Sequence, residues 1–195
     1  MKDSALVIVD MLYDFIDGTL ACHNADNAVA NTARFIDRMT EGQNGDASEI
    51  LDTYPILFIC DHHPANHCSF KENGGIWPPH CVAGTHGGEI HTDLKPHMRD
   101  ELTFYKGENS LQEQYSGFEG INSAGQSLAE VLELLDIKNV YVCGIATEFC
   151  VKSTCEDFKK NGFQVTILSE ALAYVDKQGH IDTLARMRDE GFTIL

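Results

Sequence analysis

Short apolar runs alternate with amphipathic segments along the whole chain. The runs contain few polar residues, which is typical of strands covered on both faces of a sheet. They lie at 6–9, 56–60, 102–105, 140–144, 163–168 and 192–195. Segments with apolar residues at helical spacing fall between them, at 29–39, 128–135, 151–158 and 178–190. This alternation predicts right-handed βαβ crossovers in a single domain over residues 1–195, an α/β fold. The expected architecture is a three-layer αβα sandwich with a central six-stranded parallel sheet.

Two polar stretches interrupt this pattern. Residues 41–48 follow the first predicted helix, and we expect them to form an exposed loop. The region 68–100 is rich in Gly, Pro and His, has little periodicity and is too long for a plain connection. We therefore expect it to be a functional loop region.

Reactive side chains follow the apolar runs. Asp10, Asp61 and Lys106 each come directly after a predicted strand, and Cys150 comes a few residues after another. The carboxyl ends of parallel strands share one edge of an open sheet, and ligands bind there. We therefore expect a carboxylate, a metal-type ligand, an ammonium group and a thiol to meet at one edge of the sheet.

Cys150 is the candidate nucleophile. Thr147 is placed to be the N-cap of the next helix, which puts Cys150 in its first turn, near position N3. Free N–H groups and the helix dipole favour an anion there, and they can lower the pKa of a thiol from about 8.5 by one or more units. The alternative is a buried structural cysteine. Asp10 and Lys106 favour the reactive interpretation, because an ammonium stabilises a thiolate and a carboxylate can carry its proton.

A second set of residues has the composition of a metal site. Asp61 and His63 are two positions apart in an extended segment, so their side chains can point to the same side, away from His62. His80 can supply a third ligand from the loop region, whereas His67 is expected to support a ligand rather than bind the metal. Two imidazoles and one carboxylate suit one divalent metal ion, with Zn²⁺ as the first choice and Fe²⁺ or Mn²⁺ as alternatives.

Composition and charge argue against several classes of protein. With 43% apolar and 23% charged residues, the chain has the balance of an ordinary globular protein. A formal net charge of -16 repels phosphate backbones, so nucleic acid is not an expected partner. No apolar run approaches the roughly 18 residues that a membrane span needs, and the first residues do not form a signal peptide. The seven cysteines form no C-x-x-C pair, which without a secretion signal indicates reduced thiols and a cytoplasmic location.

Several short motifs together carry a family resemblance. They are Val9-Asp10 with Asp14-Phe15, 61–70 (DHHPANHCSF), 77–82 (WPPHCV) with Gly84-Thr85, Lys106-Gly107, 115–118 (YSGF) and 144–151 (GIATEFCV). Each motif is weak or moderate by itself, but their order and completeness make the joint signal specific. Over nearly its whole length the chain resembles the nicotinamidase (pyrazinamidase-type) branch of the isochorismatase-like cysteine hydrolases, and this resemblance implies the hydrolase fold of that superfamily.

The resemblance implies roles for individual residues at the strand ends. Asp10, Lys106 and Cys150 would form the catalytic triad. The peptide bond between Ile145 and Ala146 would be cis, which is uncommon before a residue other than proline. It would direct the N–H groups of Ala146 and Cys150 into the pocket as an oxyanion hole.

The resemblance also implies the metal ligands and the substrate contacts. The implied ligands are Asp61, His63 and His80, with His67 behind them. The implied contacts to a flat pyridine ring are Phe15, Trp77, Tyr115 and Ile145. Two residues depart from the family pattern, Leu12 in place of a frequent Gln and His62 in place of a common Trp, and neither removes a group that the chemistry needs.

The implied activity is hydrolysis of nicotinamide to nicotinate and ammonia through a thioester on Cys150, with the pyridine nitrogen anchored by the metal. Pyrazinamide, a close isostere, would also be a substrate. Two alternatives stay open: another amidase of the superfamily with a different amide or carbamoyl substrate, and a non-catalytic metal- or redox-sensing module. A homo-oligomer is one alternative for the assembly, and NAD salvage and detoxification are the alternative pathways.

Overall fold

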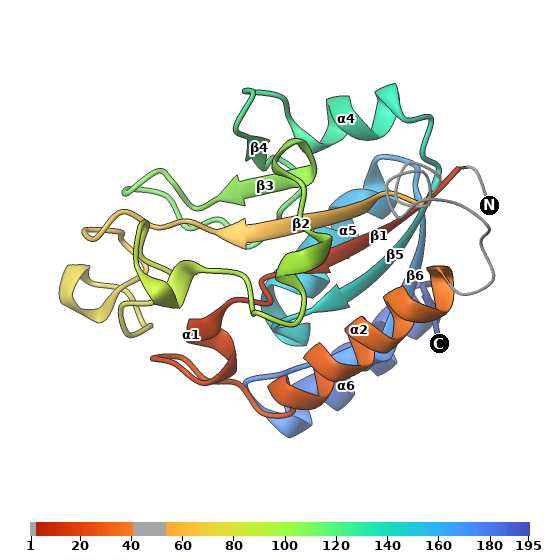
Figure 1. The fold of residues 1–195 in the computed structure, drawn as a ribbon. Coiled ribbons are helices and arrows are strands. Elements are labelled where there is room, and N and C mark those ends of the chain that lie inside the picture. The colour runs from red at the N-terminus through yellow and green to blue at the C-terminus, as the bar shows by residue number, and fades with distance from the viewer. Residues whose placement is uncertain (1–2, 41–53) are drawn as a thin grey trace.

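A seven-stranded sheet runs through the computed structural model, which describes residues 3–40 and 54–195 (Figure 1). The strand order is β4-β3-β2-β1-β5-β6-β7. The bounds are β1 Ser4–Val9, β2 Ile56–Asp61, β3 Thr103–Lys106, β4 Ile121–Asn122, β5 Asn139–Gly144, β6 Gln164–Leu172 and β7 Thr193–Ile194. Every neighbouring pair is parallel except β3 and β4.

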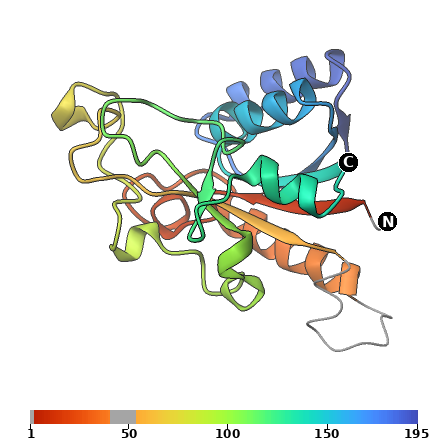
Figure 2. The same cartoon turned by 90° about the horizontal axis from the view of Figure 1, so that it is seen from above.

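Helices cover both faces of this sheet. Figure 2 shows α2 on one side and α4, α5 and α6 on the other. Their bounds are α2 Ala25–Thr40, α4 Leu128–Leu134, α5 Lys152–Lys160 and α6 Lys177–Asp189. Successive side chains of a strand point to opposite faces, so Val7 and Val9 join the core under α4, α5 and α6, whereas Leu6 and Ile8 join the core under α2. The predicted three-layer αβα sandwich is confirmed.

The predicted number of strands is one too low. The additional strand, β4, pairs antiparallel with β3 at the sheet edge through Phe104↔Asn122 and Tyr105↔Ile121. Two residues are too few to show an alternation of apolar and polar positions. The strand exists because β3 offers it an edge, and no local pattern signals that.

The predicted helices lie close to observed ones, but the short helical elements were missed. α5 ends at Lys160 and is followed by Gly162 at φ +89°, so the predicted helix stop near 161–162 is confirmed. The helix α1 (Tyr13–Ile16) was not predicted. The loop region contains only the 3₁₀ turns η1 Lys71–Asn73, η2 His86–Gly88 and η3 Lys95–His97 before η4 Asp100–Leu102 leads into β3. The loop predicted at 41–48 lies outside the described residues.

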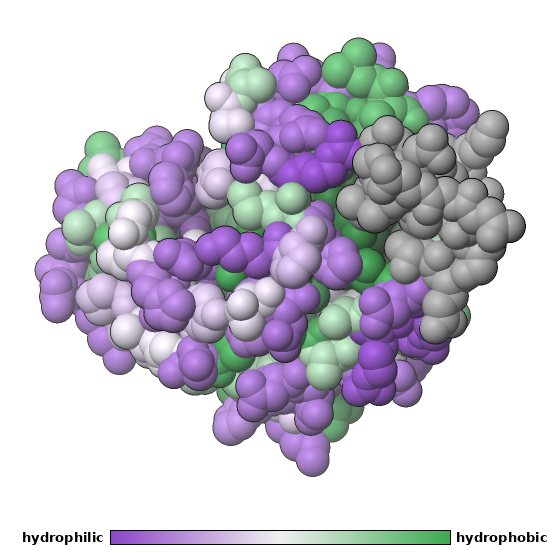
Figure 3. Space-filling view, viewed as in Figure 1, coloured by the Kyte–Doolittle hydropathy of each residue, from purple (hydrophilic) through white to green (hydrophobic). Residues whose placement is uncertain are grey.

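The surface and the interior each show one further feature. The face seen in Figure 3 is mostly hydrophilic, and polar side chains break up its apolar patches. None of the helices in the described part of the chain is long and apolar enough to cross a membrane. Between α2 and the sheet lies a cavity of about 510 Å³, which we call the α2 cavity.

Candidate active site

Three strands and one helical turn bring four reactive side chains to the carboxyl edge of the sheet. Asp10 directly follows β1, while Asp61 ends β2 and Lys106 ends β3. The parallel register of β2 and β3 pairs Asp61 with Lys106. Cys150 lies in η5 (Thr147–Val151), a π-helical turn between β5 and α5. All four side chains are buried, so their charges act on one another with little screening by water.

The ammonium group of Lys106 lies between two carboxylates and the thiol. Its Nζ is 3.0 Å from Asp10 Oδ2 and 3.5 Å from Cys150 Sγ, and it forms a close ion pair with Asp61 Oδ1. Oδ1 of Asp10 accepts a hydrogen bond from the backbone N–H of Asp61 at 2.8 Å. Oδ2 accepts no well-aligned hydrogen bond from any described residue. One oxygen therefore orients Asp10, and the other can take a proton from the nearby thiol.

Burial and charge define which of these groups are ionised. Burial and the charge of Asp61 raise the pKa of Asp10, Lys106 opposes them, and the net result is a pKa of about 6. Burial also raises the pKa of Asp61, but Lys106 and His63 outweigh this effect and hold the pKa below its usual range. Burial lowers the pKa of Lys106, but the two carboxylates and Cys150 raise it well above its ordinary value. Near neutral pH the site therefore holds two carboxylates and an ammonium.

The pKa of Cys150 differs from the sequence-based expectation. Burial raises the pKa of this thiol well above its ordinary value. Lys106 lowers it, but Asp10 and Asp61 oppose that effect because a thiolate would add a third negative charge. The expectation of a lowered pKa is therefore wrong for the resting site, and the thiol needs a base before it can attack.

The turn that carries Cys150 also begins differently from the prediction. Thr147 is not the N-cap, since its hydroxyl donates to the Ala173 carbonyl at 3.0 Å.

The cis peptide expected between Ile145 and Ala146 is present. Within 3–40 and 54–195, the backbone N–H of Ala146 donates no backbone hydrogen bond, and that of Cys150 donates none outside its own turn. The N–H of Ala146 is thus free to donate to a ligand.

Asp61, His63 and His80 form a compact set of metal-type donors. Nε2 of His63 is 3.4 Å and Nε2 of His80 is 4.0 Å from Asp61 Oδ2, and the three donor atoms lie within 4.8 Å of one another. Nδ1 of His63 donates to the Gly107 carbonyl at 2.9 Å, and Nδ1 of His80 donates to the Pro78 carbonyl at 2.8 Å. These bonds direct both Nε2 atoms to the carboxylate, as in metal sites where a carbonyl orients each imidazole. The donor set fits one divalent ion.

His67 lies behind this set rather than in it. Its Nδ1 is 2.7 Å from Ser69 Oγ, and its Nε2 is 3.1 Å from the carbonyl of Gln112. Its ring stacks on that of His63, with 4.1 Å between the ring centroids. Because protein atoms engage both ring nitrogens, His67 is placed to support His63.

The two residues that depart from the family pattern lie outside the reactive set. Leu12 is fully buried and bridges to Ile90 of the loop region. His62 points away from the donors, and its Nδ1 is 2.8 Å from Glu108 Oε1 on the outside. Neither side chain contacts the thiol or the ammonium.

Aromatic side chains line a cavity beside Cys150, which we call the strand-end cavity. Its lining is Phe15, Leu20, Cys22, Asp61, Trp77, His80, Glu113, Tyr115, Ala146, Phe149, Cys150 and Val175. Nε1 of Trp77 donates to the Tyr115 hydroxyl at 3.2 Å, and the ring of Phe149 is edge-on to Trp77 with 5.1 Å between centroids.

Three of the four expected substrate contacts, Phe15, Trp77 and Tyr115, are therefore in this lining. Ile145 is not, because its side chain is fully buried in the core under α2. This placement does not match its expected contact with substrate. Phe149 and Glu113 line the cavity but were missed. The position of Phe149 directly before the nucleophile was an available signal, whereas no pattern distinguishes Glu113 in the loop after β3.

Comparison with known proteins identifies the family. Residues 4–195 match the family model of the isochorismatase domain. The chain belongs to the isochorismatase family. Within this family, the nicotinamidase/pyrazinamidase of Mycobacterium tuberculosis (strain ATCC 25618 / H37Rv) is 33% identical over 187 residues, which cover 94% of this chain and 94% of that protein.

Solved structures of similar proteins share the fold. The pyrazinamidase of Pyrococcus horikoshii, in complex with zinc, has a TM-score of 0.84 and 34% identity, covering 99% of this chain and 98% of that one. The L. infantum protein PnC1, in complex with nicotinate, has a TM-score of 0.82 and 31% identity. The match covers 100% of this chain and 93% of that one. The sandwich described above is thus the isochorismatase-like hydrolase fold.

Proposed function

We propose that this protein acts as a nicotinamidase, an amide hydrolase that converts nicotinamide to nicotinate and ammonia. The observation that carries the proposal is the buried Lys106 ammonium, 3.0 Å from a carboxylate oxygen of Asp10 and 3.5 Å from the Cys150 sulfur. The names of the similar proteins, which include nicotinamidases and a structure with nicotinate, support this substrate.

The reaction begins with proton transfer from Cys150 to Asp10. The thiol is protonated at rest, and Asp10, with a pKa of about 6, is a carboxylate near neutral pH and can accept that proton. Lys106 stabilises the thiolate, whose sulfur attacks the carboxamide carbon. The N–H groups of Ala146 and Cys150 hold the resulting oxyanion, an effect worth about 3 kcal/mol per donor.

The second half of the reaction returns the proton and releases the acid. Protonated Asp10 gives its proton to the departing nitrogen, and ammonia leaves a thioester on Cys150. Asp10 then takes a proton from water, and the oxygen attacks the thioester carbon. The sulfur leaves as a thiolate and regains the proton from Asp10, which restores the resting site.

Asp61, His63 and His80 would hold one divalent metal ion beside the triad. Zinc is our first choice, because two imidazoles and a carboxylate suit it and the similar pyrazinamidase was solved with zinc. When bound, the ion supplies an electrophilic anchor for the ring nitrogen of the substrate. Phe15, Trp77 and Tyr115 would hold the flat ring between their side chains.

An assay of ammonia release tests the proposal directly. Purified protein should release ammonia from nicotinamide and from pyrazinamide, and a chelator should reduce both rates. Ammonia released only from a different amide would favour another amidase of the superfamily. Reversible oxidation of Cys150 without release of ammonia from any amide would favour a sensing module.

We also propose that residues 1–195 act as one domain and that the reaction takes place in the cytoplasm. One family domain spans 4–195. Each of the seven cysteines lies in the described part of the chain as a free thiol, which suits a reducing compartment. The expected partner is a small neutral amide.

A further inference from the structure

His80 is the proposed metal ligand that lies farthest along the chain from a strand end. Asp61 ends β2 and His63 follows it closely, whereas His80 belongs to the loop between η1 and η2. The Pro78 carbonyl orients the His80 ring but is part of the same loop. On one side the backbone of His63 holds the loop, since its N–H donates to the Cys81 carbonyl at 3.0 Å and its carbonyl accepts from the N–H of Ala83 at 2.9 Å. The N–H of Cys81 points elsewhere and is held by a different element.

The short helix α1 and the residues after it contact this loop on both sides of His80. Oδ2 of Asp14, a buried carboxylate, accepts a hydrogen bond from the backbone N–H of Cys81 at 2.7 Å. The hydroxyl of Thr19 donates to the carbonyl of Pro79 at 2.7 Å. Oδ1 of Asp14 also accepts from the backbone N–H of Thr19 at 3.1 Å. The two contacts therefore form one connected clamp.

The backbone that Asp14 contacts is in an unusual conformation. Cys81 has φ +46°, in the left-handed region that residues other than glycine seldom adopt. On its other side the carboxylate touches Gly87, where an added Cβ would lie 2.0 Å from Asp14 Oδ2 and 2.3 Å from its Cγ. Cys81 and Gly87 thus leave the carboxylate a single position.

We propose that Asp14 is a positioning residue that fixes the backbone at Cys81 and thereby sets how tightly the three proposed ligands hold a divalent ion. The inference rests on the proposed function through the assignment of those ligands. A carboxylate suits this role because its two oxygens accept from two backbone N–H groups, one on each segment. Asparagine offers only one such oxygen, and its NH₂ group would face the other N–H.

The test is the affinity of the full chain for Zn²⁺, measured by competition with a chromophoric chelator. Asp14→Asn should raise the dissociation constant by about 10- to 100-fold, the usual effect of losing a partner that orients a ligand. Gly87→Ala should raise it too, because the new Cβ displaces the carboxylate without changing its charge. Thr19→Val removes an exposed hydroxyl and should give a smaller increase.

Asp17→Asn is the matched control for Asp14→Asn. It makes the same substitution at an exposed aspartate directly after α1. Its affinity for Zn²⁺ should equal that of the wild type. The absorption spectrum of the Co²⁺-loaded protein, which reports the coordination geometry, should change in Asp14→Asn and Gly87→Ala but not in Asp17→Asn.

A merely structural role of Asp14 gives a different result. It would lower the unfolding temperature of the metal-free protein while Zn²⁺ affinity and the Co²⁺ spectrum stay at wild-type values, and that result overturns the proposal. If Asp14→Asn does not fold, Thr19→Val decides, and an unchanged affinity there overturns the proposal as well. Failure of the wild type to bind Zn²⁺, Fe²⁺ or Mn²⁺ would overturn the proposed metal site, and this inference with it.

Discussion

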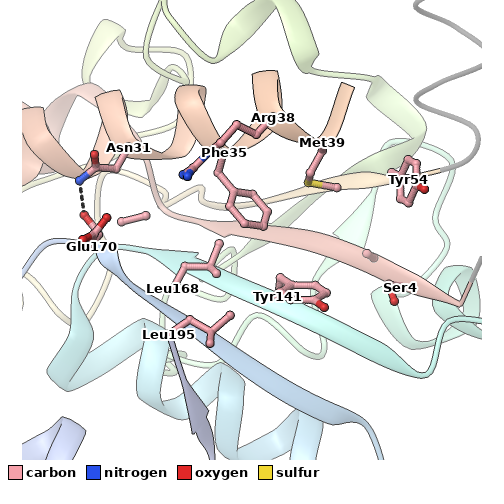
Figure 4. Close-up of a pocket in the computed structure, with 12 residues that line it drawn as sticks. Ser4, Asn31, Phe35, Arg38, Met39, Tyr54, Tyr141, Leu168, Glu170 and Leu195 are labelled. Carbon is pink, nitrogen blue, oxygen red and sulfur yellow. Dashed lines mark hydrogen bonds between the residues drawn. The ribbon is translucent and has the colours of Figure 1, made fainter. Parts of the chain in front are cut away.

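The α2 cavity and the strand-end cavity differ in size and in chemistry. The α2 cavity has about 510 Å³ and mostly apolar walls, with Phe35, Tyr141 and Leu168 pointing into it (Figure 4). The strand-end cavity has only about 30 Å³, and aromatic side chains and buried polar groups line it. The smaller cavity nevertheless is lined by Cys150 and by two of the proposed metal ligands, Asp61 and His80.

The difference shows that volume does not identify an active site. At the α2 cavity, Asn31 Nδ2 donates to the Glu170 carbonyl at 2.5 Å and so joins α2 to β6 (Figure 4). At the strand-end cavity, buried charges shift one another's pKa, and this makes proton transfer possible near neutral pH. Four predictions test this contrast between the α2 cavity and the strand-end cavity, beginning with the largest expected effect on catalysis.

Removal of the nucleophile should have the largest effect. Cys150→Ala should reduce kcat for nicotinamide by about a millionfold, because no other group can form the thioester. Zn²⁺ binding should remain. The matched control is Cys143→Ala, a buried thiol in β5 outside the strand-end cavity. Steady-state ammonia release and metal content are the measurements, and equal losses in both variants would contradict the assignment.

Removal of the proposed base comes next. Asp10→Asn keeps the shape of the side chain but cannot take the thiol proton, so kcat should fall by about 10²- to 10⁴-fold. Asp136→Asn, at an exposed aspartate paired with Lys138, should leave kcat unchanged. A wild-type rate in Asp10→Asn would assign the base to another residue.

The pH profile should show a smaller, graded effect. Asp10 must be a carboxylate to act as the base, and its pKa is raised to about 6. Protonation below that pH removes the base, so kcat/KM should fall about tenfold for each pH unit below about 6 and level off above it. The check is kcat/KM for nicotinamide, measured between pH 4.5 and 8. A kcat/KM that stays constant below pH 6 would contradict the prediction.

The smallest effect on catalysis is expected at the α2 cavity. Leu168→Ala should lower the free energy of unfolding by about 2 kcal/mol through lost burial. Its kcat and KM should stay within about twofold of the wild type, because no group of the strand-end cavity changes. Urea unfolding measures the free energy of unfolding, and the ammonia assay measures kcat and KM. A large loss of kcat in a stably folded variant would show that the two cavities are coupled.

Elements that carry an apolar run or an apolar period were predictable from the sequence, and those without one were not. The runs at 6–9 and 56–60 correspond to β1 and β2, since a buried strand leaves a continuous apolar run. α1 and β4 have four and two residues, too few for any period. The cis peptide at Ile145–Ala146 came from the family resemblance and not from a local pattern.

The candidate site shows the same division. The sequence by itself determined which reactive groups meet, because Asp10, Asp61 and Lys106 end parallel strands and such ends share one edge. Only the tertiary structure decided their state, since burial and two carboxylates raise the pKa of Cys150. It also decided the contact of Asp14 with Cys81, 67 positions away. Sequence patterns report a residue's neighbours along the chain, whereas desolvation and cross-fold hydrogen bonds depend on its neighbours in space.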